Sequence, residues 1–271
     1  ARALDGATFT GCDAVVSAGP ARAFTQEEAA ALAHYLDGGG RLLLLLGPLL
    51  DPAVTRFAES GLEDLLRARG VRPSQSVVVD PERRLGESPA FVVDDGYEAH
   101  PITERFPGRR TLWTLARPVR ALPVPPLSDG AQWKAVEIVK AGERSFGETD
   151  LASLRESRAV VGDGDERGPV PLAVAAEAAG RPARLLVIGA SRFGHNDTMA
   201  LYNKDLVLAG LSWLLAQEQA VRIEPKRPEQ LRLALADDQL TRLFLVTVVG
   251  MPLMALLLGL GVLRSEERRV G

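Results

Sequence analysis

Cysteine is nearly missing from this sequence, which has one, Cys12, among 271 residues. A single thiol excludes an internal disulfide and any zinc site built on cysteines. Aromatic residues are also scarce, with three Trp and three Tyr, which disfavours a cleft that stacks sugars on aromatic rings. The 32 basic residues do not outnumber the 35 acidic ones, and the net charge of −3 argues against broad nucleic-acid binding, which needs a basic surface.

The sequence also lacks the motifs of the commonest catalytic sites. Gly38, Gly39 and Gly40 follow a predicted helix and precede a predicted strand, whereas a phosphate-binding loop has the opposite order. No G-x-S-x-G motif is present, and Cys12 lies before a strand without the tight strand-to-helix turn that a nucleophile needs. We interpret Cys12 as a buried, inert thiol. The chain is therefore predicted to be neither an ATPase nor an enzyme of another kind, and to need no cofactor.

The three histidines have no spacing that indicates a metal site, and none is predicted. His34 lies within a predicted helix, where we expect a partly exposed structural residue. His100 precedes Pro101, and we expect it to make an orienting hydrogen bond in a loop. His195 follows a predicted strand in the sequence GHND, where ligands commonly bind in open sheets.

The first 80 residues alternate strand and helix signals. Residues 13–18 (DAVVSA) predict a strand, and the next helix begins at Thr25, which forms a capping-box pattern with Glu28. Residues 42–46 are five consecutive leucines, typical of a strand that is buried on both faces of a parallel sheet. Asp51 and Pro52 resemble the start of a second helix with an apolar stripe through Leu66, and residues 77–79 predict a third strand.

The remainder of the chain is less regular. Residues 81–126 are rich in Pro, Gly and Arg and predict excursions and edge strands, and residues 142–168 predict an exposed loop. Regular structure returns with strands at 170–178 and 184–188, and with a helix that Asn203 caps and that continues to Ala216. We predict an α/β fold with a doubly wound, mostly parallel sheet, flavodoxin-like or glutamine-amidotransferase-like, with an irregular β-containing insertion.

Candidate binding residues follow from this fold. Ligands in open α/β sheets bind beyond the carboxyl ends of the strands. The residues at those ends are Ser17, Gly19, Gly189, Ser191, His195 and Asn196.

Residues 243–263 have no charged side chain over 21 positions. As a helix they would extend roughly 31 Å, the thickness of a bilayer's hydrocarbon core. We expect one C-terminal transmembrane helix at 243–263, a linker at 221–242, and an extracytoplasmic α/β domain at 1–220 of a bacterial inner-membrane protein. The chain begins without Met, and we expect a truncated N-terminus. Residues 264–271 (RSEERRVG) match a translated sequencing adapter, and we expect them not to be native.

Several phrases, in their order, resemble the GldG-like ABC-transporter auxiliary proteins, a family associated with gliding motility. The phrases cover essentially the whole chain up to residue 263, and the residues that carry them are 13–20, 24–25, 27–28 and 35–40, then 100–103 (HPIT) with Phe106, 168–169 (GP) with 172–174 (LAV), 188–189, Ser191 and Phe193, and 203–215. The chain departs from the family where Ala190 and Arg192 replace two aspartates of a GDSDF turn.

The resemblance implies a non-catalytic subunit that works beside the ATPase and the permease of an ABC transporter, in contact with the permease or with an envelope ligand. Two alternatives remain open. One is a carbohydrate- or peptide-binding module that serves the transporter, and the other is a degenerate amidotransferase-like hydrolase. The sequence names neither the cargo of the transporter nor a role in gliding.

Overall fold

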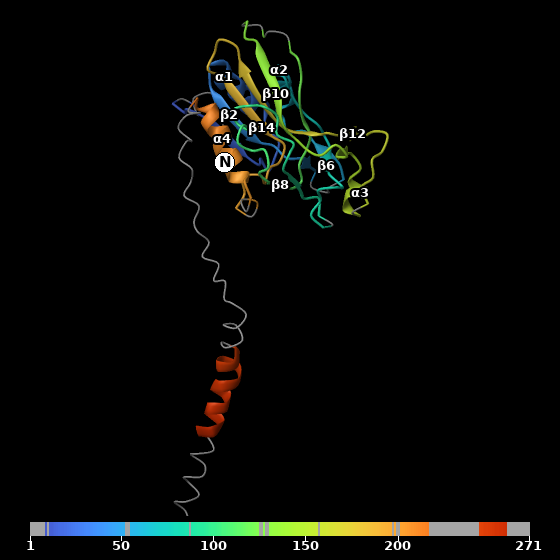
Figure 1. Ribbon diagram of the computed structural model, residues 1–271. Coiled ribbons are helices and arrows are strands. Elements are labelled where there is room, and N and C mark those ends of the chain that lie inside the picture. The colour runs from blue at the N-terminus through green and yellow to red at the C-terminus, as the bar shows by residue number, and fades with distance from the viewer. Residues whose placement is uncertain are drawn as a thin grey trace, which may run out of the picture. The chain divides into compact units, whose positions relative to one another are not determined.

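The computed structural model describes residues 9, 11–51, 55–86, 88–124, 127, 130–156, 158–196, 198, 201–216 and 244–258 (Figure 1). The chain divides into two compact units, Ala1–Ile223 and Glu224–Gly271. Each unit is described by itself below. The predicted linker at 221–242 and the tail at 264–271 lie outside the described residues, and the predicted domain boundaries stay predictions.

The first unit is built on a five-stranded sheet with the order β1-β2-β14-β13-β10. Its strands are β1 (Val15–Ala18), β2 (Arg41–Leu45), β14 (Arg184–Ile188), β13 (Pro171–Ala178) and β10 (Trp133–Lys140). The pairs β1/β2 and β2/β14 are parallel, whereas β13 runs antiparallel to both of its neighbours. The leucines of β2 are buried on both faces, as their uninterrupted run predicts.

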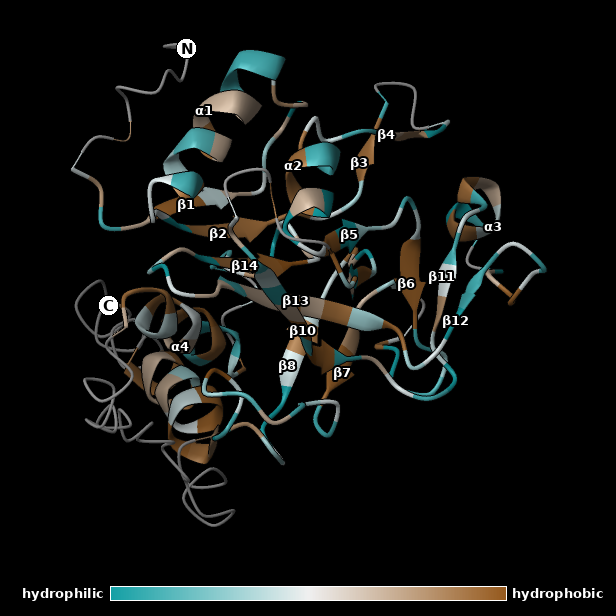
Figure 2. Ribbon diagram, turned by 90° about the horizontal axis from the view of Figure 1, so that it is seen from above, coloured by the Kyte–Doolittle hydropathy of each residue, from teal (hydrophilic) through white to brown (hydrophobic). Residues whose placement is uncertain are grey.

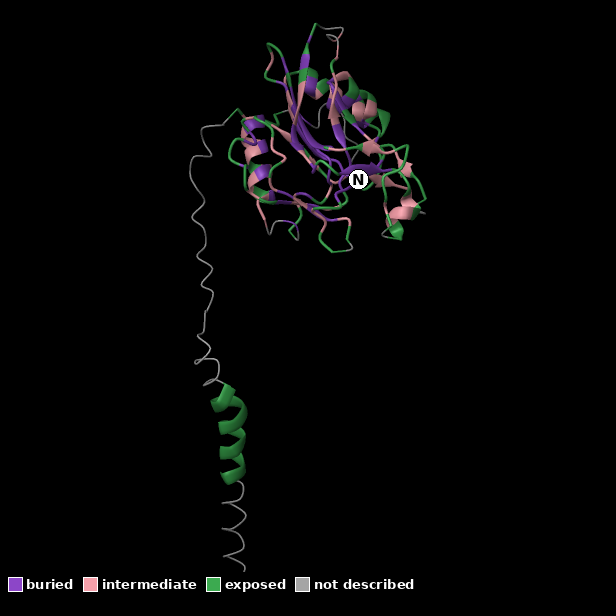
Figure 3. Cartoon of the chain, turned by 45° about the vertical axis from the view of Figure 1, so that its right-hand side comes forward, coloured by how far each residue is buried: buried purple, intermediate pink, exposed green. Residues whose placement is uncertain are grey.

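Helices cover the two faces of this sheet (Figure 2). On one face, α1 (Gln26–Asp37) and α2 (Glu63–Ala68) pack against Leu42 and Leu44. On the other face, α4 (Asn203–Leu214) contributes Leu206 to a second core with Leu43 and Leu45. Alternate leucines of one strand therefore supply both cores, because successive side chains of a strand point to opposite faces. Figure 3 shows buried residues gathered along the strands between the helices.

The capping box at the start of α1 is confirmed. The Thr25 hydroxyl accepts a hydrogen bond from the Glu28 backbone N–H at 3.3 Å, and the Glu28 carboxylate accepts one from the Thr25 N–H at 3.0 Å. Arg22 adds a two-pronged contact to the same carboxylate, at 2.8 and 2.9 Å. These contacts pair the donors that a helix N-terminus otherwise leaves unsatisfied.

The predicted doubly wound, mostly parallel fold is wrong. Four small antiparallel pairs or sheets accompany the mixed main sheet within the described residues, and the helices are few and short. One cause is visible at the turn through Gly180, which has φ +73°. That turn joins β13 to β14 directly, and so short a connection makes neighbouring strands antiparallel, since a parallel crossover needs a dozen or more residues. The valine strand β6 (Val77–Val79) was predicted as a third parallel strand, but it pairs antiparallel with β11.

The strands of the smaller sheets lie between residues 49 and 121 and between residues 146 and 167, so they include segments on both sides of the irregular stretch at 81–126. Their groupings are β12-β11-β6, β3-β4, β5-β9 and β7-β8. Their strands are β3 (Leu49–Leu50), β4 (Phe57–Ala58), β5 (Val71–Pro73), β7 (Phe91–Val93), β8 (Thr111–Trp113), β9 (Val119–Ala121), β11 (Phe146–Glu148) and β12 (Glu166–Arg167), and the short helix α3 (Leu151–Arg155) follows β11.

The helix predicted to start at Asp51 is also wrong in its described part. The Asp51 carboxylate accepts hydrogen bonds from the backbone N–H groups of Thr55 (2.6 Å) and Arg56 (3.1 Å), which closes a turn between β3 and β4. Aspartate favours such turns as strongly as helix caps, so its side chain alone does not separate the two. The helix of this segment, α2, begins only at Glu63.

In the second unit, residues 244–258 are helical, with exposed side chains (green in Figure 3). Among the residues that the structure describes, no helix has both the length and the apolar character that a membrane crossing requires. This finding contradicts the predicted transmembrane helix at 243–263 and the inner-membrane location inferred from it. The described helix has 15 residues, fewer than the roughly 20 that a crossing takes. Residues 243 and 259–263 lie outside the described residues.

Candidate functional site

The carboxyl ends of β1, β2 and β14 meet at one edge of the sheet. Ala18, Leu45 and Ile188 lie in register across the three strands. The backbone N–H of Gly19 donates to the carbonyl of Leu45 at 3.0 Å, and the N–H of Leu46 donates to the carbonyl of Ile188 at 2.8 Å. The three segments that follow these strands therefore leave the sheet at the same edge. Ligand sites in open α/β sheets lie at such an edge.

Ser191 occupies the space where these three segments separate. Its hydroxyl oxygen accepts a hydrogen bond from the Gly47 N–H at 2.8 Å. A Cβ atom on Gly47 would lie 2.7 Å from that oxygen, and a Cβ on Gly19 would lie 3.1 Å from the Ser191 Cβ. Gly19 also has φ +69°, a conformation that suits glycine. The chain itself thus fills the space around Ser191, so these glycines allow close packing between loops.

Gly189 lies at the same edge of the sheet and packs against Arg117, which belongs to the irregular stretch at 81–126. Its N–H donates to the Leu172 carbonyl at 2.8 Å, and its carbonyl accepts from the Arg117 N–H at 2.6 Å. A Cβ on Gly189 would lie 2.1 Å from the Arg117 carbonyl oxygen. Any other residue would push the two segments apart. Gly189 is therefore required for backbone packing.

The other predicted binding residues are more separate. Ser17 lies within β1, in register with Leu44 and half-buried. His195 and Asn196 are exposed residues of the turn that follows Ser191. The structure thus brings Gly19 and Ser191 into contact, with Gly189 two residues before Ser191, and it places His195 and Asn196 at the surface. A binding role for the six residues stays a prediction.

Arg117 is a buried charge that sequence reasoning missed. It is 1% exposed, and its Nε–H donates to the Ser74 carbonyl at 2.8 Å. Burial lowers the pKa of this guanidinium to about 10, against the attraction of the Glu63 carboxylate. Its Nη1 atom has no hydrogen-bond partner among the described residues. The only signal in the sequence is an arginine placed between apolar residues in LARPV.

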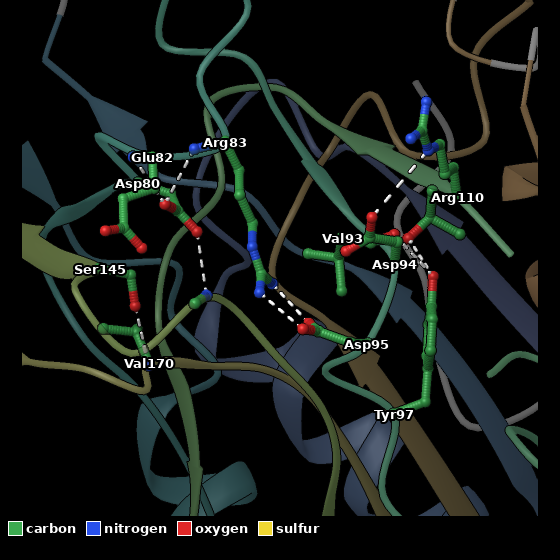
Figure 4. Close-up of polar contacts among 12 residues, drawn as sticks. Asp80, Glu82, Arg83, Val93, Asp94, Asp95, Tyr97, Arg110, Ser145 and Val170 are labelled. Atoms are coloured by element: carbon green, nitrogen blue, oxygen red, sulfur yellow. Dashed lines mark hydrogen bonds and ion pairs between the residues drawn. The ribbon is translucent and has the colours of Figure 1, made fainter. Parts of the chain in front are cut away.

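A second polar cluster, around Asp80, connects residues 80–95 to Gly142 (Figure 4). Asp80 is 1% exposed; one of its carboxylate oxygens accepts from the N–H groups of Glu82 and Arg83 at 3.2 Å, and the other accepts from the Gly142 N–H at 2.9 Å. The Arg83 guanidinium pairs with the Asp95 carboxylate at 2.6 Å. Both oxygens of Asp80 are used within the chain, so the cluster has a structural role. The signal was an aspartate directly after three buried valines.

The hydroxyl group of Tyr97 joins further segments of the same region by hydrogen bonds. It contacts the carbonyls of Val93 (3.0 Å) and Arg109 (2.9 Å) and the hydroxyl of Thr111 (2.9 Å). Burial raises the pKa of Tyr97 to about 12, so the phenol stays protonated and donates at every physiological pH.

Three individual predictions have clear outcomes. His100 makes the expected hydrogen bond, since its Nδ1 accepts from the Ile102 N–H at 3.2 Å, and its ring also packs edge-on against Trp213. His34 lies in the last turn of α1 and is exposed. The prediction of a buried Cys12 is wrong, because the residue is exposed. Cys12 lies before β1, which is an end strand of the five-stranded sheet.

Groups of three or more His, Cys, Asp or Glu side chains that can hold a metal ion do not occur among the described residues. The candidate site at the sheet edge consists of tightly packed backbone around the Ser191 hydroxyl group.

Comparison with known proteins supports the resemblance noted in the sequence. Residues 3–114 match the family model described as "ABC-type uncharacterized transport system". This match confirms the resemblance to auxiliary proteins of ABC-type transport. No curated protein matches the sequence.

Among solved structures, the chain is similar to the mmIFT52 N-terminal domain, with 18% identity and a TM-score of 0.56 over 78% of this chain and 80% of that one. It also aligns with a putative ThuA-like protein from Bacteroides uniformis, with 12% identity and a TM-score of 0.41 over 80% of this chain and 74% of that one. The first likeness concerns the fold alone, because one fold serves many functions.

Proposed function

We propose, from the match of residues 3–114 to the ABC-type transport auxiliary family, that this chain is a non-catalytic subunit of an ABC transporter that contacts the permease. That match is the observation that carries the proposal. ABC transport needs an ATPase and a permease, and this sequence has no phosphate-binding loop of its own. The chain therefore acts beside those subunits.

The geometry of the sheet edge supports a contact role over turnover. An active site needs an open position where a reacting atom meets a nucleophile and its base. At the ends of β1, β2 and β14 that position is taken by Ser191, whose hydroxyl oxygen is bonded to the Gly47 N–H. The loops at this edge are closely packed, and rigid loops make precise docking surfaces.

The test is co-purification from cells. The tagged chain is expressed in its native cells, and ATPase and permease subunits of ABC transporters that are retained with it are identified by mass spectrometry. We expect both subunits to be retained by the tagged chain and not by an unrelated tagged domain. The proposal is rejected if neither subunit is retained.

The enzymatic alternative has its own test in the same cells. Cys12→Ala removes the one thiol that a cysteine nucleophile would need. We expect transport to continue in the Cys12→Ala variant at the level of the unsubstituted chain. Loss of transport in that variant, with normal folding, argues for chemistry at Cys12.

A further inference from the structure

One hydrogen-bond donor of the buried Arg117 side chain is not used by the rest of the described chain. The residue is 1% exposed, and its Nε–H donates to the Ser74 carbonyl at 2.8 Å. Its Nη1 atom is also buried and has no partner among the residues that the structure describes. A charged donor that is buried without an acceptor is costly, so such groups normally bond to protein or to ordered water.

The charged group that acts on this guanidinium is the carboxylate of Glu63, at the start of α2. Arg117 precedes Pro118, which restricts it to an extended conformation, so its side chain projects to the same side as that of Val119. Val119 shares a hydrophobic core with Leu62, the residue before Glu63. The Glu63 carboxylate attracts the guanidinium and opposes the lowering of the Arg117 pKa by burial. The attraction acts without a direct hydrogen bond from Nη1.

Glu63 has room for one more hydrogen bond. Its Oε1 accepts from the N–H and the hydroxyl of Ser60, at 2.7 and 2.9 Å, whereas its Oε2 accepts from the Gly61 N–H, at 2.9 Å. A carboxylate oxygen can accept two hydrogen bonds, so Oε2 keeps capacity for a second donor. Burial opposes ionisation of Glu63, but the hydrogen bonds from Ser60 and Gly61 outweigh it and lower the pKa of this carboxyl. The group is therefore a charged acceptor at neutral pH.

We propose that one internal water molecule bridges the two side chains, accepting a hydrogen bond from Arg117 Nη1 and donating one to Glu63 Oε2. Water commonly completes a polar contact between groups that do not touch, and internal waters bind where buried polar groups need partners. An anion is disfavoured in this place, because the Glu63 carboxylate repels it.

The bridge supports the edge of the main sheet. The Arg117 N–H donates to the Gly189 carbonyl at 2.6 Å, so the backbone that carries the guanidinium is the backbone that packs against Gly189. A hydrated charge pair joins this backbone to the start of α2. The inference does not depend on the transporter role.

The first test is a crystal structure of the full chain at a resolution that shows ordered water. We expect a water within hydrogen-bond distance, about 2.7–3.2 Å, of both Arg117 Nη1 and Glu63 Oε2. The proposal is overturned if no water lies there, or if Nη1 contacts Glu63 directly. It is also overturned if crystals grown with bromide show an anomalous signal at this position, which identifies an anion.

The second test counts long-lived internal waters in solution by oxygen-17 relaxation dispersion. Arg117→Met keeps most of the side-chain volume without the donors, and we expect it to lose the signal of one water molecule. Arg72→Met is the matched control, since Arg72 is exposed on β5, and its signal should equal that of the original chain. Circular dichroism checks the fold of both variants. An unchanged signal in Arg117→Met, or an equal loss in the two variants, contradicts the bridge.

Discussion

The side-chain amide of Asn203 pairs with both backbone groups of Leu112. Its Oδ1 accepts from the Leu112 N–H, and its Nδ2 donates to the Leu112 carbonyl, both at 2.7 Å. Asn203 is fully buried at the start of α4, and Leu112 is the middle residue of β8. This one side chain thus joins the helix on one face of the main sheet to a strand of the excursion.

Replacing Asn203 with Ala is expected to lower the free energy of unfolding by about 1–3 kcal/mol, because two backbone groups of the half-buried Leu112 lose their partner. Urea unfolding of the full chain measures this change. Asn196→Ala is the control, since Asn196 is exposed, and it should change the free energy by less than about 0.5 kcal/mol. Equal effects of the two substitutions would contradict the role assigned to Asn203.

Packing at the sheet edge is tested at Gly47. A Cβ there would lie 2.7 Å from the Ser191 hydroxyl oxygen and 2.8 Å from its backbone nitrogen. We expect Gly47→Ala to lower the free energy of unfolding by about 1–3 kcal/mol, as overpacking does. In Gly164→Ala the new methyl group would meet only the Thr149 hydroxyl oxygen, at 4.0 Å, and the change is expected to be close to neutral. Thermal unfolding distinguishes the two, and an unchanged melting temperature for Gly47→Ala would refute the tight packing.

The buried charge of Arg117 gives a third prediction. Met has a similar volume and no charge, so Arg117→Met removes the desolvation cost while it fills the space, and the free energy of unfolding should change by less than about 1 kcal/mol. Arg117→Ala leaves a cavity and should cost about 3 kcal/mol. Denaturant unfolding compares the two variants. If Met and Ala were equally destabilising, the guanidinium itself would be the stabilising group.

The start of α1 predicts a pH dependence. The hydrogen bonds from Arg22, followed by that from the Thr25 N–H, lower the pKa of Glu28 to about 2 in the folded state. A carboxyl whose folded pKa lies below its unfolded value stabilises the fold above the unfolded pKa, and this stabilisation is lost as the pH falls toward the folded pKa. The loss for Glu28 is therefore expected between about pH 4.5 and pH 2.

The measurement is urea unfolding at several pH values for the original chain and for Glu28→Gln. The variant should be less stable at pH 7, and the difference between the two should shrink as the pH approaches 2. A constant difference would show that the charge of Glu28 is not the cause. Glu104→Gln, at an exposed position, serves as the control.

Local signals in the sequence predicted local structure well. The Thr25 and Glu28 pair specified the start of α1, because capping depends only on residues within one turn. The leucine run also predicted the buried strand β2. An uninterrupted apolar run indicates by itself that both faces of a strand are buried. The strands β13 and β14 were likewise placed within a few residues of their observed bounds.

Pairing between distant segments could not be predicted in this way. The valines of β6 are equally suited to a parallel or an antiparallel neighbour, and their partner β11 lies nearly 70 residues later in the chain. Asn203 was predicted as a helix cap, a role that its side chain can fill alone, whereas it bonds Leu112, which lies 91 residues away.

The position of β1 has a practical consequence. Within the described residues this strand pairs with β2 alone, and Val16 is 49% exposed. A strand with one unpaired side offers a row of N–H and C=O groups to any extended peptide, and natural proteins usually protect such strands with lysine, proline or a covering segment. β1 has neither lysine nor proline among its four residues, VVSA. Preparations of this chain at high concentration are therefore expected to associate through intermolecular strand pairing at β1, and a charged residue at position 16 is the simplest way to prevent it.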